Sequence, residues 1–232
     1  SFINHAFSTK LGGVSTGEFT SMNFAFNRGD NPDHVTENYK RFCKSAGFDY
    51  NTLTASAQDH NTFVRAVTTE NVGTGIYKPR DIASVDALIT NQKGVTLVTY
   101  YADCTPLFFV DTNKKAIGLA HAGWRGTVGR IGEKVVQKMT ELYGTNPADL
   151  KCAVGPAISV CCYEVDKPCA DHFLALENVN PSDFVHPKEN GKYMVDLLET
   201  NRQILVAAGV KSENITISDK ELYVRYGTLS AL

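Results

Sequence analysis

The sequence has little net charge, no long apolar run and no paired cysteine motif, and each absence narrows what the chain can do. It has 23 Lys and Arg against 25 Asp and Glu, a formal net charge of −2. Nothing in this balance favours nucleic acid or an anionic membrane surface as a partner. No apolar run approaches the roughly 20 residues that a membrane-spanning helix needs. The first residues show no secretory signal, so we expect a cytoplasmic protein.

The six cysteines are few for a chain of 232 residues, and none of them forms a C-x-x-C pair. This argues against a zinc ribbon. It also argues against a disulfide framework, because such frameworks are dense in small secreted domains. We therefore expect reduced thiols. Cys161 and Cys162 are adjacent, which prevents easy pairing with each other, and we interpret them as packing residues rather than a redox pair.

Composition and pattern together predict one layered domain over residues 1–232. Apolar residues make up 43% of the chain and charged residues 21%, which is ordinary for a globular domain with its own core. Strands and helices interleave, and several successive strands have no helix between them, so we expect a mixed-sheet α/β or α+β fold. The predicted strands span residues 4–9, 54–58, 63–67, 86–90, 97–101, 107–111, 116–120, 151–156 and 215–217. The predicted helices span residues 35–46, 128–143, 165–176 and 196–208, and loops are predicted at 72–80 and 180–191.

One stretch concentrates the reactive side chains. Cys104 and His121 each follow a predicted strand, and the only tryptophan, Trp124, comes shortly after His121 together with Arg125. Side chains at the ends of buried strands are held by a rigid scaffold and still reach a cleft. This clustering of a thiol, an imidazole, an indole and a guanidinium makes the stretch the candidate site.

A third donor, His60, lies at the predicted turn between two strands. If it converges with Cys104 and His121, the three give a Cys/His/His set. Three nitrogen or sulfur ligands with a fourth position open are typical of catalytic zinc. Zinc would deprotonate the thiol and lower the pKa of bound water to about 7.

The residues leave other chemistries open. Cys104 could be a nucleophile with His121 as its base, and Asp103 or Gln58 could orient the imidazole or bind an oxyanion. A single His₂Cys copper site is also compatible with these donors. The six histidines include no H-x-H pair, which argues against a self-contained multicopper oxidase. A non-enzymatic binding module is a further class.

Two features could bind an anion. A helix predicted to start with Thr127 as its N-cap would bring free N–H groups and the helix dipole beside Arg125, an arrangement that suits phosphate. The alternative for Arg125 is a buried salt bridge. The glycine-rich turn at residues 10–17 could cradle a phosphate with its backbone N–H groups, or it is an ordinary loop.

The run ADCTP at residues 102–106 and the run HAGWRGT at residues 121–127 resemble the signature of the YfiH/YlmD family. Its members are labelled laccase-domain proteins, polyphenol oxidases or peptidoglycan editing factors. The family fold is similar to the catalytic domain of the cytotoxic necrotizing factor toxins, which deamidate a protein glutamine with Cys and His. Agreement continues in order along nearly the whole chain: FST at 7–9, GGVS at 12–15, QDH at 58–60, DALIT at 86–90, VGPAI at 154–158 and CYEV at 162–165.

The resemblance implies a metal site of His60, Cys104 and His121, with zinc expected and copper as the alternative ion. It implies phosphorolysis of adenosine, inosine, guanosine and methylthioadenosine, with adenosine deamination as a second activity. The alternatives are a cysteine-dependent amidase that edits a peptidoglycan precursor and a copper-dependent polyphenol oxidase. We expect a monomer or weak homodimer whose partners are purine nucleoside and phosphate. The expected catalytic residues are the three donors and Arg125, and the expected substrate-binding residues are Gln58, Asp103, Trp124 and Lys10.

The sequence departs from the family pattern at several positions. Lys10 stands where the family often has Arg, which keeps a charge but loses bidentate phosphate binding. Asp59 replaces an apolar residue, and Asn61 replaces a small one. The family's C-terminal motif, a Cys-Thr pair followed by an F-S-x-R-like segment, is not recognisable in residues 219–226.

Overall fold

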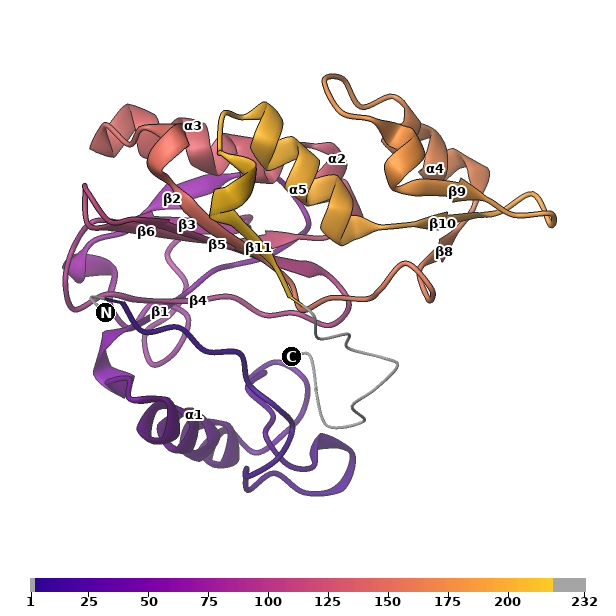
Figure 1. Cartoon of the computed structure of the whole chain (residues 1–232). Coiled ribbons are helices and arrows are strands. Elements are labelled where there is room, and N and C mark those ends of the chain that lie inside the picture. The colour runs from indigo at the N-terminus through magenta and orange to yellow at the C-terminus, as the bar shows by residue number, and fades with distance from the viewer. Residues whose placement is uncertain (1–2, 219–232) are drawn as a thin grey trace.

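The computed structural model describes residues 3–218, and a six-stranded mixed sheet lies at its centre (Figure 1). The strand order is β11–β7–β5–β6–β3–β2. The β2–β3 and β7–β11 pairs are parallel and the other pairs are antiparallel, which confirms the predicted mixed sheet. The bounds are β2 Val64–Ala66, β3 Ala87–Thr90, β5 Thr105–Asp111, β6 Ala116–Ala122, β7 Lys151–Val154 and β11 Ile215–Ile217.

Helices cover one face of this sheet and form the main core with it (Figure 1). They are α2 Trp124–Val128, α3 Ile131–Tyr143 and α5 Leu197–Ala207. α3 ends at Gly144 in the left-handed conformation, with φ 65°, as a glycine C-cap requires. The fully buried side chains that meet between helices and sheet include Leu107, Phe109, Val135, Met139 and Leu205.

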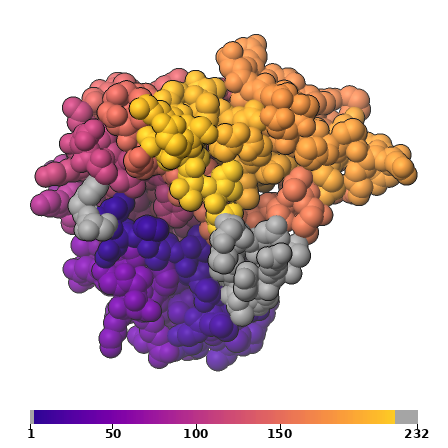
Figure 2. All heavy atoms as spheres, viewed as in Figure 1, coloured from indigo at the N-terminus to yellow at the C-terminus, as the bar shows by residue number. Residues whose placement is uncertain are grey.

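Two smaller units complete the fold. On the other side of the main sheet, α1 Pro32–Ala46 packs on the parallel pair of β1 Leu53–Ala55 and β4 Thr96–Val98 (Figure 1). The second unit is a lobe of α4 Lys167–Leu174 with β8 Glu164–Val165, β9 Val185–Pro187 and β10 Tyr193–Val195. Figure 2 shows this lobe projecting from the body of the molecule.

The first predicted strand, residues 4–9, is wrong because this segment pairs with no strand of the sheet. It is held instead by ring contacts and by a hydrogen bond from the Asn4 side-chain amide to the Gly47 carbonyl at 3.3 Å. The ring centroids of Phe7 and Tyr101 lie 5.8 Å apart, and those of His5 and Phe108 lie 6.3 Å apart. The alternation of apolar and polar residues over 4–9 therefore reflects a segment that packs its rings against the protein without joining a β-sheet.

The predicted helix over residues 128–143 corresponds to α3, which begins three residues later, and a separate short helix, α2, precedes it. α2 ends at Val128, and α3 begins after Arg130, which adopts φ 59° in the left-handed region. Thr127 is not an N-cap: it is buried inside α2, where its hydroxyl accepts a hydrogen bond from the Asn201 amide at 3.0 Å. Leu142, predicted on the buried face, is 45% exposed.

The predicted loop at residues 180–191 contains β9, and the short strands β8 and β10 were not predicted. Each is only two or three residues long, so no alternation had room to show in the sequence. Pro187 lies in β9, an edge strand of this small sheet, where a missing N–H is tolerated.

None of the helices within residues 3–218 is long and apolar enough to cross a membrane. Residues 219–226, where the family's C-terminal motif is not recognisable, lie outside the described residues.

The two faces of α3 give a stability test. Met139 is fully buried against the sheet, whereas Leu142 on the same helix is 45% exposed. We expect Met139→Ala to lower the free energy of unfolding by about 2–5 kcal/mol through lost transfer energy and a cavity. Leu142→Ala should change it by no more than about 0.5 kcal/mol. Urea unfolding measures both, and equal losses would contradict this packing of α3.

Candidate metal centre

Three donors from distant parts of the chain meet at one end of the β5–β6 hairpin. Cys104 directly precedes β5, His121 lies near the end of β6, and His60 lies in the turn between β1 and β2. Each offers a ligand atom, and these atoms all lie within 4.8 Å of one another. The His60 and His121 rings have centroids 4.9 Å apart. The predicted convergence of His60, Cys104 and His121 is thus confirmed.

Cys104 does not follow a strand as predicted, because β4 ends at Val98. The side-chain amide of Gln58 occupies both backbone groups of Tyr100. The Tyr100 N–H donates to Oε1 at 2.7 Å, and Nε2 donates to the Tyr100 carbonyl at 2.6 Å. A strand partner therefore has no access there. These two hydrogen bonds connect the turn that carries His60 to the segment that leads into Cys104.

The carboxylate of Asp86 organises both histidines. Asp86 is fully buried just before β3. Its oxygens accept hydrogen bonds from the backbone N–H groups of Asp59, His60 and Asn61, each at 3.1 Å. The same carboxylate lies 2.8 Å from Nδ1 of His121. It therefore holds the His60 turn, in which His60 has φ 68°, and it fixes the plane of the His121 ring.

This pairing determines which nitrogen of His121 can bind a metal. Nδ1 is engaged by Asp86, so Nε2 is left as the ligand atom. A carboxylate behind a histidine ligand is the usual support of a zinc-binding imidazole. The sequence reasoning did not select Asp86 as a site residue. The available signal was an acidic residue at the start of the predicted strand over residues 86–90.

The absence of a side chain at Gly123 leaves space beside two of the donors. A Cβ atom built on Gly123 would lie 2.8 Å from Nδ1 of His60 and 3.0 Å from Sγ of Cys104. Only glycine leaves this space open. Two imidazoles and one thiolate match the donor chemistry of zinc, and they could also hold one copper ion. Within residues 3–218 this is the one such group of donors, so the ligands for a multicopper cluster are not there.

The Cys104 thiol is poorly suited to act as a free nucleophile. Burial, together with the charges of Asp103 and Asp86, raises its pKa to about 11. Among the described residues no hydrogen bond joins its sulfur to either histidine. A nucleophilic cysteine needs a lowered pKa or an adjacent base. This environment suits a thiol that loses its proton to a metal.

Trp124 and Arg125 lie next to the donors on α2. The Arg125 guanidinium lies over the Trp124 ring, 4.3 Å from its centroid, and the ring centroids of Trp124 and His172 lie 5.7 Å apart. Arg125 is exposed and forms no ion pair within the described part of the chain. The buried salt bridge considered for Arg125 is therefore wrong, as is the helix start at Thr127.

Three central N–H groups of the glycine-rich turn are already engaged within the protein. The N–H groups of Gly13, Val14 and Ser15 donate to Ser21 Oγ, Asn38 Oδ1 and the Ser21 carbonyl. These three groups are therefore not available for the phosphate cradle considered for this turn. Lys10 is exposed at its start, and its place in substrate binding stays a prediction.

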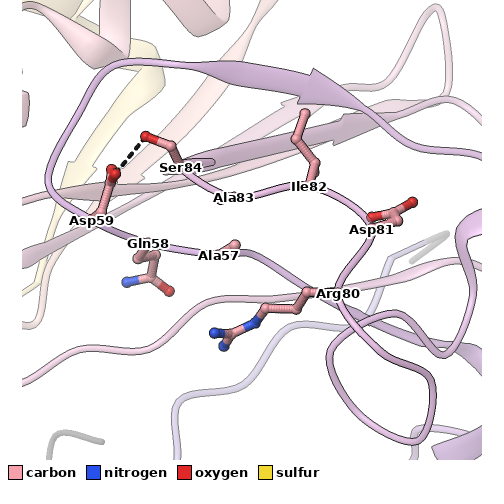
Figure 3. A pocket seen from close by; sticks show the side chains of 8 residues that line it. All are labelled: Ala57, Gln58, Asp59, Arg80, Asp81, Ile82, Ala83 and Ser84. Atoms are coloured by element: carbon pink, nitrogen blue, oxygen red, sulfur yellow. Dashed lines mark hydrogen bonds between the residues drawn. The ribbon is translucent and has the colours of Figure 1, made fainter.

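A hollow of about 450 Å³ lies beside the His60 turn (Figure 3). Gln58 and Arg80 line it, and the Asp59 carboxylate on its rim accepts hydrogen bonds from Ser84 Oγ at 2.5 Å and from Asn61 Nδ2 at 2.6 Å. Asp59 and Asn61, which flank His60, are two of the positions that depart from the family pattern. Here they tie the His60 turn to the segment before β3.

The comparisons with known proteins show the family of the chain. Residues 4–225 match the family described as "Multi-copper polyphenol oxidoreductase laccase". The chain belongs to this family. The description names copper, whereas the described donors of this member suffice for one ion and do not specify which.

Relatives carry the name of one activity. The chain is 37% identical over 213 residues to "Purine nucleoside phosphorylase YlmD" of Bacillus subtilis, covering 91% of this chain and 76% of that protein. It is 37% identical over 208 residues to a "Purine nucleoside phosphorylase" of Deinococcus radiodurans, covering 90% and 76%.

Solved structures confirm the fold. The hypothetical protein YfiH of Bacillus licheniformis superposes with a TM-score of 0.88 at 33% identity, over 93% of this chain and 81% of that one. YlmD of Geobacillus stearothermophilus superposes with a TM-score of 0.84 at 35% identity, over 92% and 79%.

Replacing Asp86 by Asn tests its role as organiser. An amide cannot accept all four hydrogen bonds, so the His60 turn and the His121 ring lose their shared support. We expect metal affinity to fall about 10–100-fold, measured by competition with a chromogenic chelator. Asp81→Asn is the control, because Asp81 is an exposed carboxylate paired with Arg65 at 2.6 Å. Equal affinities of the wild type and both variants would contradict the role of Asp86.

The same variant carries a pH signature. Burial alone would raise the pKa of Asp86, but the hydrogen bond from His121 and the backbone N–H groups lower it below its ordinary value. A carboxylate with a lowered folded pKa stabilises the fold above about pH 4, and the contribution disappears as the pH falls through that lowered pKa. The stability difference between wild type and Asp86→Asn should therefore shrink on acidification.

Proposed function

We propose that this chain is a purine nucleoside phosphorylase with a zinc ion held by His60, Cys104 and His121. Its substrates are adenosine, inosine, guanosine and methylthioadenosine, and it also deaminates adenosine. The observation that carries the proposal is this donor set, converging within 4.8 Å in a chain whose relatives are named for phosphorolysis. The cytoplasmic location and the monomeric or weakly dimeric state remain predictions.

The exposure of the donors favours a catalytic rather than a structural ion. His121 is buried and Cys104 half-buried, whereas His60 lies exposed. Three protein ligands with one side open leave a position for substrate or water. A bound zinc ion supplies a fixed positive charge that polarises an oxygen placed against it.

Phosphorolysis replaces the bond between ribose C1′ and purine N9 with a bond between C1′ and a phosphate oxygen, and the purine leaves with a proton. Arg125 is our candidate for the phosphate, because its guanidinium is exposed, carries no carboxylate partner in residues 3–218 and is fixed against Trp124. A planar guanidinium binds phosphate through two parallel hydrogen bonds. Lys10 would add a second positive charge.

The remaining candidates have separate roles. Asp103, half-buried beside Cys104, is the carboxylate that we assign to holding the proton. The half-buried ring of Trp124 offers an aromatic surface for the base. Gln58 has both ends of its amide engaged with Tyr100, so we assign it to positioning the His60 turn rather than to contact with substrate.

Two alternative activities, a cysteine amidase and a copper-dependent oxidase, would be distinguished by the experiment described below. A metal-free cysteine amidase would need a reactive thiolate, which the raised pKa of Cys104 opposes. A copper-dependent polyphenol oxidase is suggested by the family description. One His₂Cys site could hold a single copper ion but not a multicopper cluster.

The test is product analysis by mass spectrometry after incubating purified protein with adenosine, with and without phosphate. We expect adenine and ribose phosphate only with phosphate, and inosine in either tube. Cys104→Ala should lose the metal and at least 100-fold of both activities. Cys169→Ser, a half-buried cysteine in the α4 lobe, should retain them.

Untouched adenosine in both tubes would overturn the proposal. An active and metal-loaded Cys104→Ala protein would overturn the metal assignment. Inactivation by a thiol alkylator but not by a chelator would favour the amidase, and phenol oxidation that requires added copper would favour the oxidase.

A further inference from the structure

Two adjacent thiols lie exposed outside the metal centre. Cys161 and Cys162 are both exposed, so their interpretation as packing residues is wrong. Their sulfur atoms lie 3.2 Å apart, and the Ser159 hydroxyl lies 3.1 Å from the Cys161 sulfur. Neither position is used by the proposed reaction.

The pair is held in place by a tight turn. The N–H groups of Cys162 and Tyr163 both donate to the Ser159 carbonyl, at 3.0 and 3.1 Å. The Ile158 N–H donates to the Asp103 carbonyl at 3.1 Å. The thiols therefore sit on a loop that is bonded to the segment carrying Cys104.

The chain geometry disfavours closure of the pair into a disulfide. Neighbouring Cα atoms are about 3.8 Å apart across a trans peptide, whereas disulfides usually join Cα atoms about 4.4–6.8 Å apart. Such a bond would be strained and readily reduced. Two neighbouring thiols that resist joining each other can instead both bind one ion.

Their separation suits one bridging ion. Two thiolates on one tetrahedral ion, with bonds of about 2.3 Å, lie roughly 3.8 Å apart. The observed 3.2 Å is closer to this separation than to an S–S bond of about 2.05 Å. We propose that Cys161 and Cys162 form a dithiol site that binds a thiophilic metal or metalloid ion, separate from the His60–Cys104–His121 centre.

Phenylarsine oxide is the probe, because trivalent arsenic takes two thiols at once. Two As–S bonds form, the As–O bond breaks, and the two thiol protons leave with the oxygen as water, so no redox partner is needed. A single thiol holds the reagent through one bond only, and excess monothiol exchanges it. A chelating pair resists monothiol and releases the arsenic to a small dithiol.

The experiment measures the intact mass of the metal-loaded protein after phenylarsine oxide and then excess 2-mercaptoethanol. We expect one phenylarsenic group to remain on the wild type and on Cys169→Ser, and to be removed by ethanedithiol. The Cys161→Ser and Cys162→Ser variants should each retain at least tenfold less phenylarsenic adduct than the wild type. Adenosine phosphorolysis should be unchanged in both single variants, so this result is independent of the proposed function.

Two outcomes would overturn the proposal. One is complete loss of arsenic from the wild type in monothiol. The other is retention by Cys161→Ser and Cys162→Ser at the wild-type level, which would place the adduct elsewhere. Circular dichroism of each variant establishes that it is folded, and the exposure of both positions makes these substitutions mild.

Discussion

The carboxylate of Asp86 is the constraint on which the site depends. It is buried, yet four hydrogen bonds satisfy it, three from the backbone of the His60 turn and one from His121. Burying a carboxylate is costly unless it is paired and hydrogen-bonded, so the turn and the imidazole must take the positions that satisfy it. Removing these partners would leave a buried charge uncompensated. The fold thus enforces the relative placement of two donors that lie far apart in the sequence.

The remaining donor, Cys104, is positioned by the pairing of β5 with β6 and by the hydrogen bonds of Gln58. The β5–β6 register sets Thr105 opposite Ala122, which brings Cys104 beside Gly123, where the missing side chain leaves room between sulfur and imidazole. Gln58 joins the approach to Cys104 to the turn that carries His60. The three donors are therefore positioned by the β5–β6 pairing, by Gly123 and by the side chains of Asp86 and Gln58. The centre is buried on the His121 side and open to solvent on the His60 side.

Much of this could be read from the sequence. The apolar periodicity predicted α1, α5 and the central strands, because these elements bury one continuous face or a whole run. Convergence of His60, Cys104 and His121 was expected from their placement near strand ends and from the family resemblance. Other features depend on partners distant in the chain. The Gln58 amide ends β4, Arg130 interrupts the helix after His121, and the exposure of Cys161 and Cys162 follows from a lobe whose short strands carry no periodic signal. Asp86 was missed because its importance lies in four hydrogen bonds that no local pattern reveals.

The most direct test of the metal centre is X-ray absorption spectroscopy of the zinc-loaded protein, combined with metal analysis. We predict one ion at the centre, with one sulfur at about 2.3 Å and two imidazole nitrogens at about 2.0–2.1 Å, and we expect the sulfur contribution to be lost in Cys104→Ala. The same spectrum is recorded on the double variant Cys161→Ser/Cys162→Ser, in which no second ion can bind at the dithiol pair. A shell with no sulfur, or one unchanged by Cys104→Ala, would contradict the account.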